Sequence, residues 1–135
     1  MTNEEMRQSY LRQARRILAE AEHYWRTGES HLVVRRCQEC VELALKATLR
    51  AAGIEVPHVH DVGVFLREHS DKFPAHLGPH LDRLVSISRR LREERELSFY
   101  GDEETGSTAE NLYTTADADA ALADARFVLD VCAPK

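Results

Sequence analysis

The sequence predicts an all-α protein, an antiparallel bundle of about five helices in a single domain over residues 1–135. Two observations support this. Apolar residues recur at three- and four-residue steps through most of the chain, which is the period of an amphipathic helix. No segment shows the strict polar–apolar alternation of a half-buried strand. A chain of 135 residues is also the size of one ordinary domain.

The first half of the chain predicts a hairpin of two long helices. The first helix is expected to begin after Thr2, because Glu5 stands three residues later in the spacing of a capping box, and to end at Gly28. The second helix is expected from about Ser30 to Gly53. Because only a few residues connect them, the two helices must run antiparallel.

The second half predicts a short helix, a longer one, a polar loop and a last helix. Asp61 is suited to cap the short helix, which would turn Val62, Phe65 and Leu66 inward. Residues 101–115 are polar and rich in turn formers, and we expect them to form an ordered or semi-ordered loop. The other expected bounds are a loop over Ser70–Pro74, a helix over about Pro79–Phe99 and a last helix over about Ala116–Cys132.

Arg95 stands where the longer helix should continue its apolar stripe. The stripe runs through Leu77, Leu81, Leu84, Ser88 and Leu91, and its next two steps fall on Arg95 and Ser98. An arginine on a face that meets other helices needs an anion, a carboxylate partner or a hydrated groove, because burial of an unpaired charge costs several kcal/mol. Arg95 is therefore either part of a ligand site or a structural cation, which would pair with a carboxylate or reach solvent at the helix end.

The charge of the chain restricts the kind of ligand. The net charge is −5, and it is uneven: residues 1–101 hold 16 basic and 15 acidic residues, whereas residues 102–135 hold 2 and 8. The overall field therefore does not attract nucleic acid, and any site for a polyanion must be local. The densest cationic segment lies around Arg95 and contains Arg83, Arg89, Arg90, Arg92 and Arg95.

Other signals predict no membrane segment, metal or cofactor. No stretch approaches the ~20 apolar residues of a membrane helix, and the acidic start is unlike a signal peptide, so we expect a cytoplasmic protein. Cys37 and Cys40 have metal-site spacing but lie in the middle of a helix without a second pair, which favours buried cysteines. His76 and His80 have no neighbours that complete a familiar zinc site.

Several stretches together resemble a HEPN domain, a helical nucleotide-binding domain. The similarity covers roughly residues 5–130 and rests on the order and spacing of its parts. The matching parts are Ala19-Glu20-Ala21, the break at Gly28, residues 37–49, His60-Asp61-Val62 and residues 95–102.

This resemblance implies a bundle of about five helices that forms a homodimer with a groove between the protomers. In toxin members of the family an arginine and a following histidine in this groove cut RNA without metal, and many members have a small nucleotidyltransferase as antitoxin. Arg95 matches the family arginine. Tyr100, Gly101 and Asp102 occupy the positions where the histidine would stand, and this departure weakens the prediction of a nuclease.

Three functions remain open at this stage. The first is a binding module in which Arg92, Arg95, Tyr100 and Asp102 line a dimer groove for a nucleotide, an RNA segment or an acidic loop of a partner. The second is a metal-independent endoribonuclease toxin with an atypical active site, whose catalytic residues are unknown apart from Arg95. The third is a structural helical dimer in which Arg95 pairs with Glu94, Glu96 or an acidic residue of the C-terminal loop.

Overall fold

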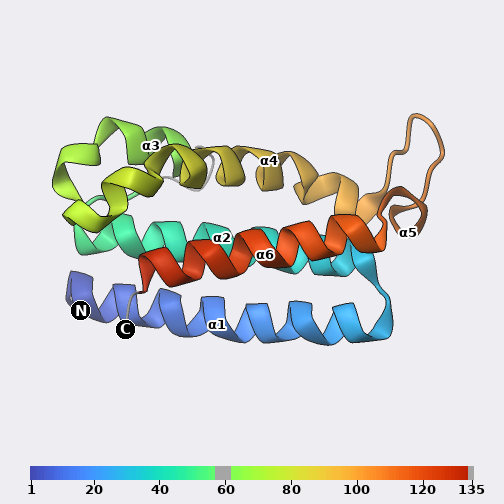
Figure 1. Ribbon diagram of the computed structural model, residues 1–135, viewed down its shortest axis with the longest axis horizontal. Coiled ribbons are helices and arrows are strands. Elements are labelled where there is room, and N and C mark those ends of the chain that lie inside the picture. Colours follow the sequence, from blue (N-terminus) through green and yellow to red (C-terminus); the bar gives the residue numbers. More distant parts are fainter. Residues whose placement is uncertain (57–61, 134–135) are drawn as a thin grey trace.

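A computed structural model describes residues 1–56 and 62–133, and it confirms the all-α bundle (Figure 1). The described part holds six α-helices and two short 3₁₀ helices instead of about five helices. None of these helices is long and apolar enough to cross a membrane. The elements are α1 (Asn3–Thr27), α2 (Ser30–Ala51), α3 (Val62–Glu68), η1 (Ser70–Lys72), η2 (Ala75–His80), α4 (Leu81–Tyr100), α5 (Ala109–Leu112) and α6 (Thr115–Cys132).

The predicted hairpin of α1 and α2 is confirmed, together with its signals. The Thr2 hydroxyl accepts a hydrogen bond from the Glu5 amide at 3.0 Å, and the Glu5 carboxylate accepts one from the Thr2 amide at 2.7 Å. Gly28 ends α1 with a φ of 80°, a left-handed conformation that glycine adopts without strain. The two helices lie side by side and antiparallel along the length of the molecule (Figure 1).

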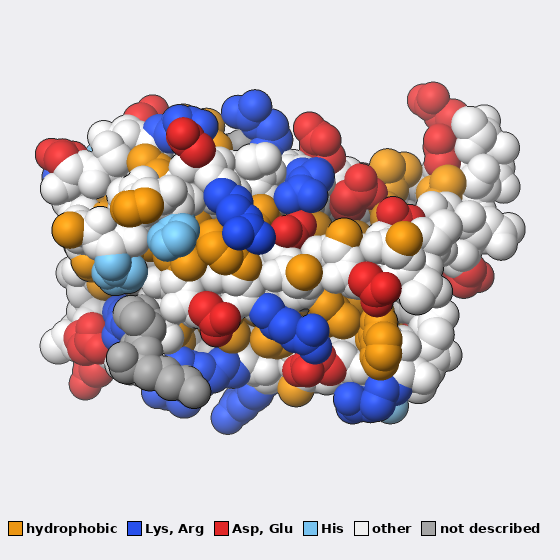
Figure 2. Space-filling model, viewed as in Figure 1, with side chains coloured by type: hydrophobic (Ala, Val, Ile, Leu, Met, Phe, Trp, Pro, Cys, Tyr) orange, Lys and Arg blue, Asp and Glu red, His pale blue; other side chains and the backbone are white. Residues whose placement is uncertain are grey.

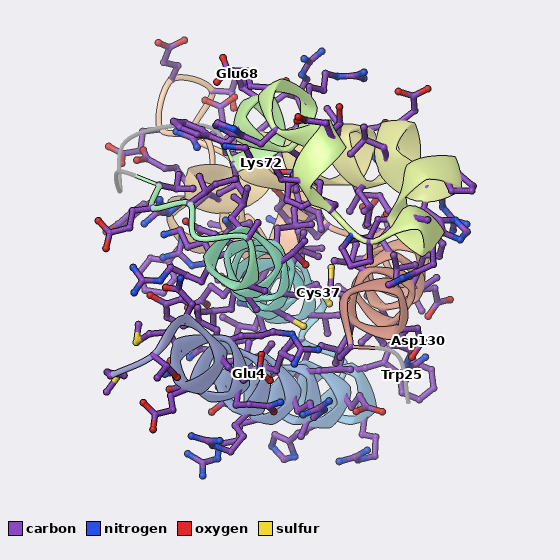
Figure 3. All side chains as sticks on the ribbon, turned by 90° about the vertical axis from the view of Figure 1, so that its left-hand side faces the viewer. Glu4, Trp25, Cys37, Glu68, Lys72 and Asp130 are labelled. Carbon is purple, nitrogen blue, oxygen red and sulfur yellow. The ribbon has the colours of Figure 1, made fainter. Side chains whose placement is uncertain are left out.

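The core is built around α2, which packs against α1, α4 and α6. Its small and branched side chains face these three helices, so their backbones approach closely. Among the described helices, no long helix covers the fourth side of α2, opposite α6 (Figure 3), and α5 contacts only its N-terminal end, where the His31 Nε2 lies 3.9 Å from a Glu110 oxygen. The buried residues of α2 are Val33, Val34, Cys37, Gln38, Cys40, Val41, Ala44, Leu45, Ala47, Thr48 and Leu49.

The region between α2 and α4 differs in detail from the prediction. Val62, at the start of α3, and Leu66 are buried as expected, whereas Phe65 is only partly buried. The predicted cap, Asp61, lies outside the described residues. Residues 75–80 form η2, so α4 begins at Leu81 and not at Pro79. Pro79 lacks a backbone N–H, and the tighter 3₁₀ turn accommodates it.

The segment after α4 is ordered by hydrogen bonds, as expected. Asp102 and Ser107 exchange backbone hydrogen bonds of 2.8 and 3.0 Å, which closes a tight turn, and the short helix α5 follows. The Tyr113 hydroxyl then donates a hydrogen bond to the Glu94 carboxylate on α4. Tyr113 therefore anchors the segment to α4 next to Arg95, whereas Leu112 is 37% exposed.

Candidate functional site

Arg95 lies on the α2-facing side of α4, as the apolar stripe predicts, but the residue is exposed because it borders open hollows. After Leu91, the only buried side chain of α4 is Ser98. Arg95 lies one turn after Leu91, at the edge of the buried stripe, where the last turns of α4 have little apolar surface to pack on. The buried residues of α4 are Leu84, Val85, Ile87, Leu91 and Ser98.

The side chain of Arg95 has no ion-pair or hydrogen-bond partner among the described residues. The described residues therefore give no support to a structural ion pair of Arg95 with Glu94, Glu96 or an acidic residue of the C-terminal loop. Glu94 accepts a hydrogen bond from Tyr113 instead. The backbone carbonyl of Arg95 accepts hydrogen bonds from the Arg35 guanidinium and from the Ser98 hydroxyl, the latter at 3.4 Å.

Arg95 borders an open groove of about 310 Å³ formed by α1, α2 and α4. Arg35 and Lys46 add two cations to the groove, and each has a carboxylate one helical turn away. The Arg35 Nε lies 3.7 Å from a Glu39 oxygen, and the Lys46 Nζ lies 3.4 Å from a Glu42 oxygen. The groove is lined by Gln13, Ile17, Arg35, Gln38, Glu39, Glu42, Leu43, Lys46 and Arg95.

Arg92 lies beside Arg95 but has a different environment. It is partly buried and already has an interaction of its own, whereas the Arg95 guanidinium is exposed. Both arginines line a narrow hollow between α2, α3 and α4 whose volume is only about 10 Å³. Of the two, Arg95 is therefore the cation that a ligand can reach.

The end of α4 presents aromatic rings next to these cations. Phe99 is 53% exposed and Tyr100 is 64% exposed, and their rings meet edge to face with centroids 5.0 Å apart. The Arg35 guanidinium lies over the Phe99 ring, 5.1 Å from its centroid. Arg35 and Phe99 were not among the predicted site residues. The sequence offers only a weak signal for Arg35, which lies four, seven and eleven residues before Glu39, Glu42 and Lys46 and therefore shares one polar face of α2 with them.

Asp102 is part of the turn rather than of the groove. Its Oδ1 accepts hydrogen bonds from the Glu104 amide at 3.1 Å and from the Thr105 amide at 3.3 Å. The preceding Gly101 has a φ of 75°, and a Cβ there would lie 2.4 Å from the Ser107 carbonyl oxygen. This glycine allows the chain to turn sharply after α4, which keeps Tyr100 at an exposed corner.

The three cysteines are buried, as expected for Cys37 and Cys40, and are neutral thiols. Burial raises the pKa of Cys37, and it raises the pKa of Cys40 to about 12. Burial also raises the pKa of Cys132 to about 11. Because the thiolate is the reactive and metal-binding form, these residues pack the core and take no part in the candidate site.

The comparisons with known proteins agree with this architecture. The sequence model of the HEPN domain matches residues 8–135, so the chain belongs to the HEPN domain family. Among solved structures, the chain is similar to TT1696 from Thermus thermophilus, with a TM-score of 0.75 and 24% sequence identity over 93% of this chain and 94% of that one. This similarity shows the fold. No curated protein matches the chain.

Proposed function

We propose that this protein binds the phosphate groups of a nucleotide or of RNA at Arg95, with Tyr100 as a stacking surface. The observation that carries the proposal is the exposed guanidinium of Arg95, which has no partner among the described residues and borders a groove with two further cations. A guanidinium holds a phosphate by two parallel hydrogen bonds. Exposed aromatic rings stack on bases with little sequence preference.

The proposed module is a cytoplasmic homodimer that acts with a nucleotidyltransferase in a toxin–antitoxin or defence-like system. Membership of the HEPN family supports this assignment. So does the exposed apolar surface formed by Leu97, Phe99 and Tyr100, because such patches on a small protein mark interaction sites. In a dimer formed through this patch, Arg95 would lie at the edge of the cleft between the protomers.

Binding is favoured over cleavage by the residues next to Arg95. Cleavage of RNA through the 2′-hydroxyl needs a group that accepts and donates protons near neutral pH. The corresponding positions hold Tyr100, Gly101 and Asp102 in place of a histidine. A tyrosine normally has a pKa near 10 and an aspartate near 3.9, so neither is suited to this task.

The test is a titration of the purified protein into a fluorescently labelled single-stranded RNA, followed by anisotropy. We expect wild type to bind and Arg95→Gln to lose binding with an unchanged melting temperature, because an exposed, unpaired side chain contributes little to folding. Arg89→Gln is the matched control, since Arg89 is exposed on the same helix and lines a hollow on a different side of it.

Two results would contradict the proposal. The first is wild-type protein that binds neither RNA nor a nucleoside triphosphate at about 50 mM salt, where phosphate contacts are strong. The second is equal loss of binding in the Arg95 and Arg89 variants. RNA that is cut in the presence of a chelator, and left intact by Arg95→Gln, would instead establish the endoribonuclease.

A further inference from the structure

We propose that the seam between α1 and α2 carries a single-stranded RNA segment of about six nucleotides, from Arg95 and Arg35 at one end to Arg50 at the other. This inference rests on the proposed function, because Arg95 is its first phosphate contact. It adds an extended track to that site and distinguishes an oligonucleotide from a mononucleotide as the ligand.

The track is continuous because two hollows share Lys46. The groove at Arg95 ends at Lys46, and the same side chain lines a second hollow of about 260 Å³. Arg35, Lys46 and Arg50 lie on one side of α2, at separations of eleven and four residues, each close to a whole number of turns. The second hollow is lined by Tyr10, Lys46, Arg50, Ile54, Glu55 and Val56.

Helix α1 provides the other wall. Tyr10, Gln13 and Ile17 follow one another at three- and four-residue steps, so they lie on the same face of α1 and face the two hollows. This side of the α1–α2 pair is the one opposite α6, and none of the long helices in the described part of the chain covers it (Figure 3). The face in Figure 2, with α6 in front, is the other side of the pair, so the proposed track lies behind it.

The length of the track fits an oligonucleotide. From Arg35 to Arg50, α2 advances fifteen residues, or about 22 Å at ~1.5 Å per residue. Stacked nucleotides repeat at about 3.4 Å along one strand, so the track spans about six of them. A mononucleotide would use only one end.

The chemistry of the track suits a phosphate chain with bases beside it. Lys46 and Arg50 provide cations, and the Arg50 Nε is buried without a hydrogen-bond partner among the described residues. Tyr10 is half-buried against the core, so its ring is held in place as a surface for a base. The apolar side chains of Ile17 and Ile54 continue that surface.

Carboxylates along the track compete with the RNA. Lys46 pairs with Glu42 at 3.4 Å, and Arg50 pairs with Glu55 at 2.7 Å. A phosphate must displace these carboxylates to reach the cations. In the free protein, the two ion pairs therefore compete with RNA binding. This arrangement gives an unusual expectation, namely that Glu42→Gln tightens RNA binding by releasing Lys46.

The experiment measures anisotropy with labelled RNAs of two, four, six and eight nucleotides. We expect affinity to rise with length up to about six nucleotides and then to level off. Arg50→Gln should weaken binding of the six-nucleotide RNA severalfold, lower its salt slope by about one, and leave binding of the dinucleotide unchanged, because Arg50 lines only the second hollow. Lys46→Gln should weaken binding of both RNAs, because Lys46 lines both hollows. Glu42→Gln should raise the affinity for the longer RNAs, whereas Glu93→Gln, on another side of the molecule, should leave that affinity unchanged.

The outcomes separate the track from the site at Arg95. Loss of binding in Arg95→Gln together with equal wild-type affinity for all four lengths would overturn the track and leave the proposed function standing. An unchanged affinity of Glu42→Gln for the eight-nucleotide RNA would also overturn it, as would displacement of RNA by hexaglutamate at equal concentration, which would indicate an acidic peptide. Wild-type protein that binds a nucleoside triphosphate but no RNA would overturn the track alone, and protein that binds neither would overturn both proposals. Circular dichroism melts of each variant confirm that it is folded.

Discussion

The guanidinium of Arg35 on α2 donates a hydrogen bond to the backbone carbonyl of Arg95 on α4, sixty residues further along the chain. The same guanidinium lies over the ring of Phe99. One side chain therefore holds the last turns of α4 against α2 by a polar and an aromatic contact. Because Arg95 and Tyr100 belong to those turns, Arg35 positions the candidate site as well as contributing a charge to it.

We expect Arg35→Gln to destabilise the protein by about 1–2 kcal/mol, since it removes a hydrogen bond from a charged donor and a cation–π contact. Urea unfolding measures this change, and RNA binding should fall as well. Arg35→Lys is the informative control, because it keeps the charge but loses the planar guanidinium. If Arg35→Lys is as stable as wild type, the stabilisation comes from charge alone and the proposed positioning role is wrong.

A second prediction concerns the turn that follows α4. Gly101→Ala should cost about 2–3 kcal/mol, because a Cβ would clash with the Ser107 carbonyl and the residue has a positive φ. Gly106→Ala is a matched control with a similar φ of 74° but open space around the Cβ, and it should cost only about 1 kcal/mol. Thermal melts of the two variants give the comparison. Equal losses would show that backbone strain, and not the close approach to Ser107, makes Gly101 necessary.

The helix ends could be read from the sequence because their signals are local. Thr2 and Glu5 cap α1 through residues three apart, and Gly28 ends it through its own φ. The short helix α5 was not predicted, since four residues carry no periodic pattern. Its N-cap Thr108 lies in a segment whose composition indicates only a loop.

The candidate site was harder to predict, because its geometry depends on contacts between distant segments. The sequence identifies Arg95 as an unusual residue on the α2-facing side of α4, but it does not show that this part of the face is an open groove. Periodicity gives the direction of a side chain and not the extent of the surface that it meets, and after Leu91 only Ser98 is buried. Arg35 gave no comparable signal, since a solvated arginine near a glutamate on a helix is ordinary.

A third prediction follows from the buried cysteines. The native protein should not react with a thiol reagent at about pH 8, and all three cysteines should react after unfolding in urea. Stability should also fall as the pH rises above about 8.5, where the unfolded thiols lose their protons. The folded state keeps the proton on Cys40 until its pKa of about 12, so over this range it binds more protons than the unfolded state. A rise in pH therefore favours the unfolded state and lowers the free energy of unfolding.

Melts between about pH 7.5 and about pH 10.5 measure this slope, and Cys40→Ala is the variant that tests its origin. The substitution should lower stability at neutral pH, because it leaves a small cavity, but it should also reduce the loss at alkaline pH. The same slope in the variant and in wild type would show that other groups, such as Tyr113 beside Glu94, cause the alkaline loss.

The last prediction is that the protein is a homodimer through the end of α4. Leu97, Phe99 and Tyr100 form an exposed apolar patch on a chain of 15.4 kDa. Light scattering at micromolar concentration should therefore give twice that mass, because association would remove the patch from water. The double variant Phe99→Ser and Tyr100→Ser should lower the mass to that of the monomer, whereas Val64→Ser, at an exposed apolar residue on α3, should leave it unchanged. A wild-type mass near 15.4 kDa would contradict the dimer and would leave Arg95 on an open surface with no second protomer to complete a cleft.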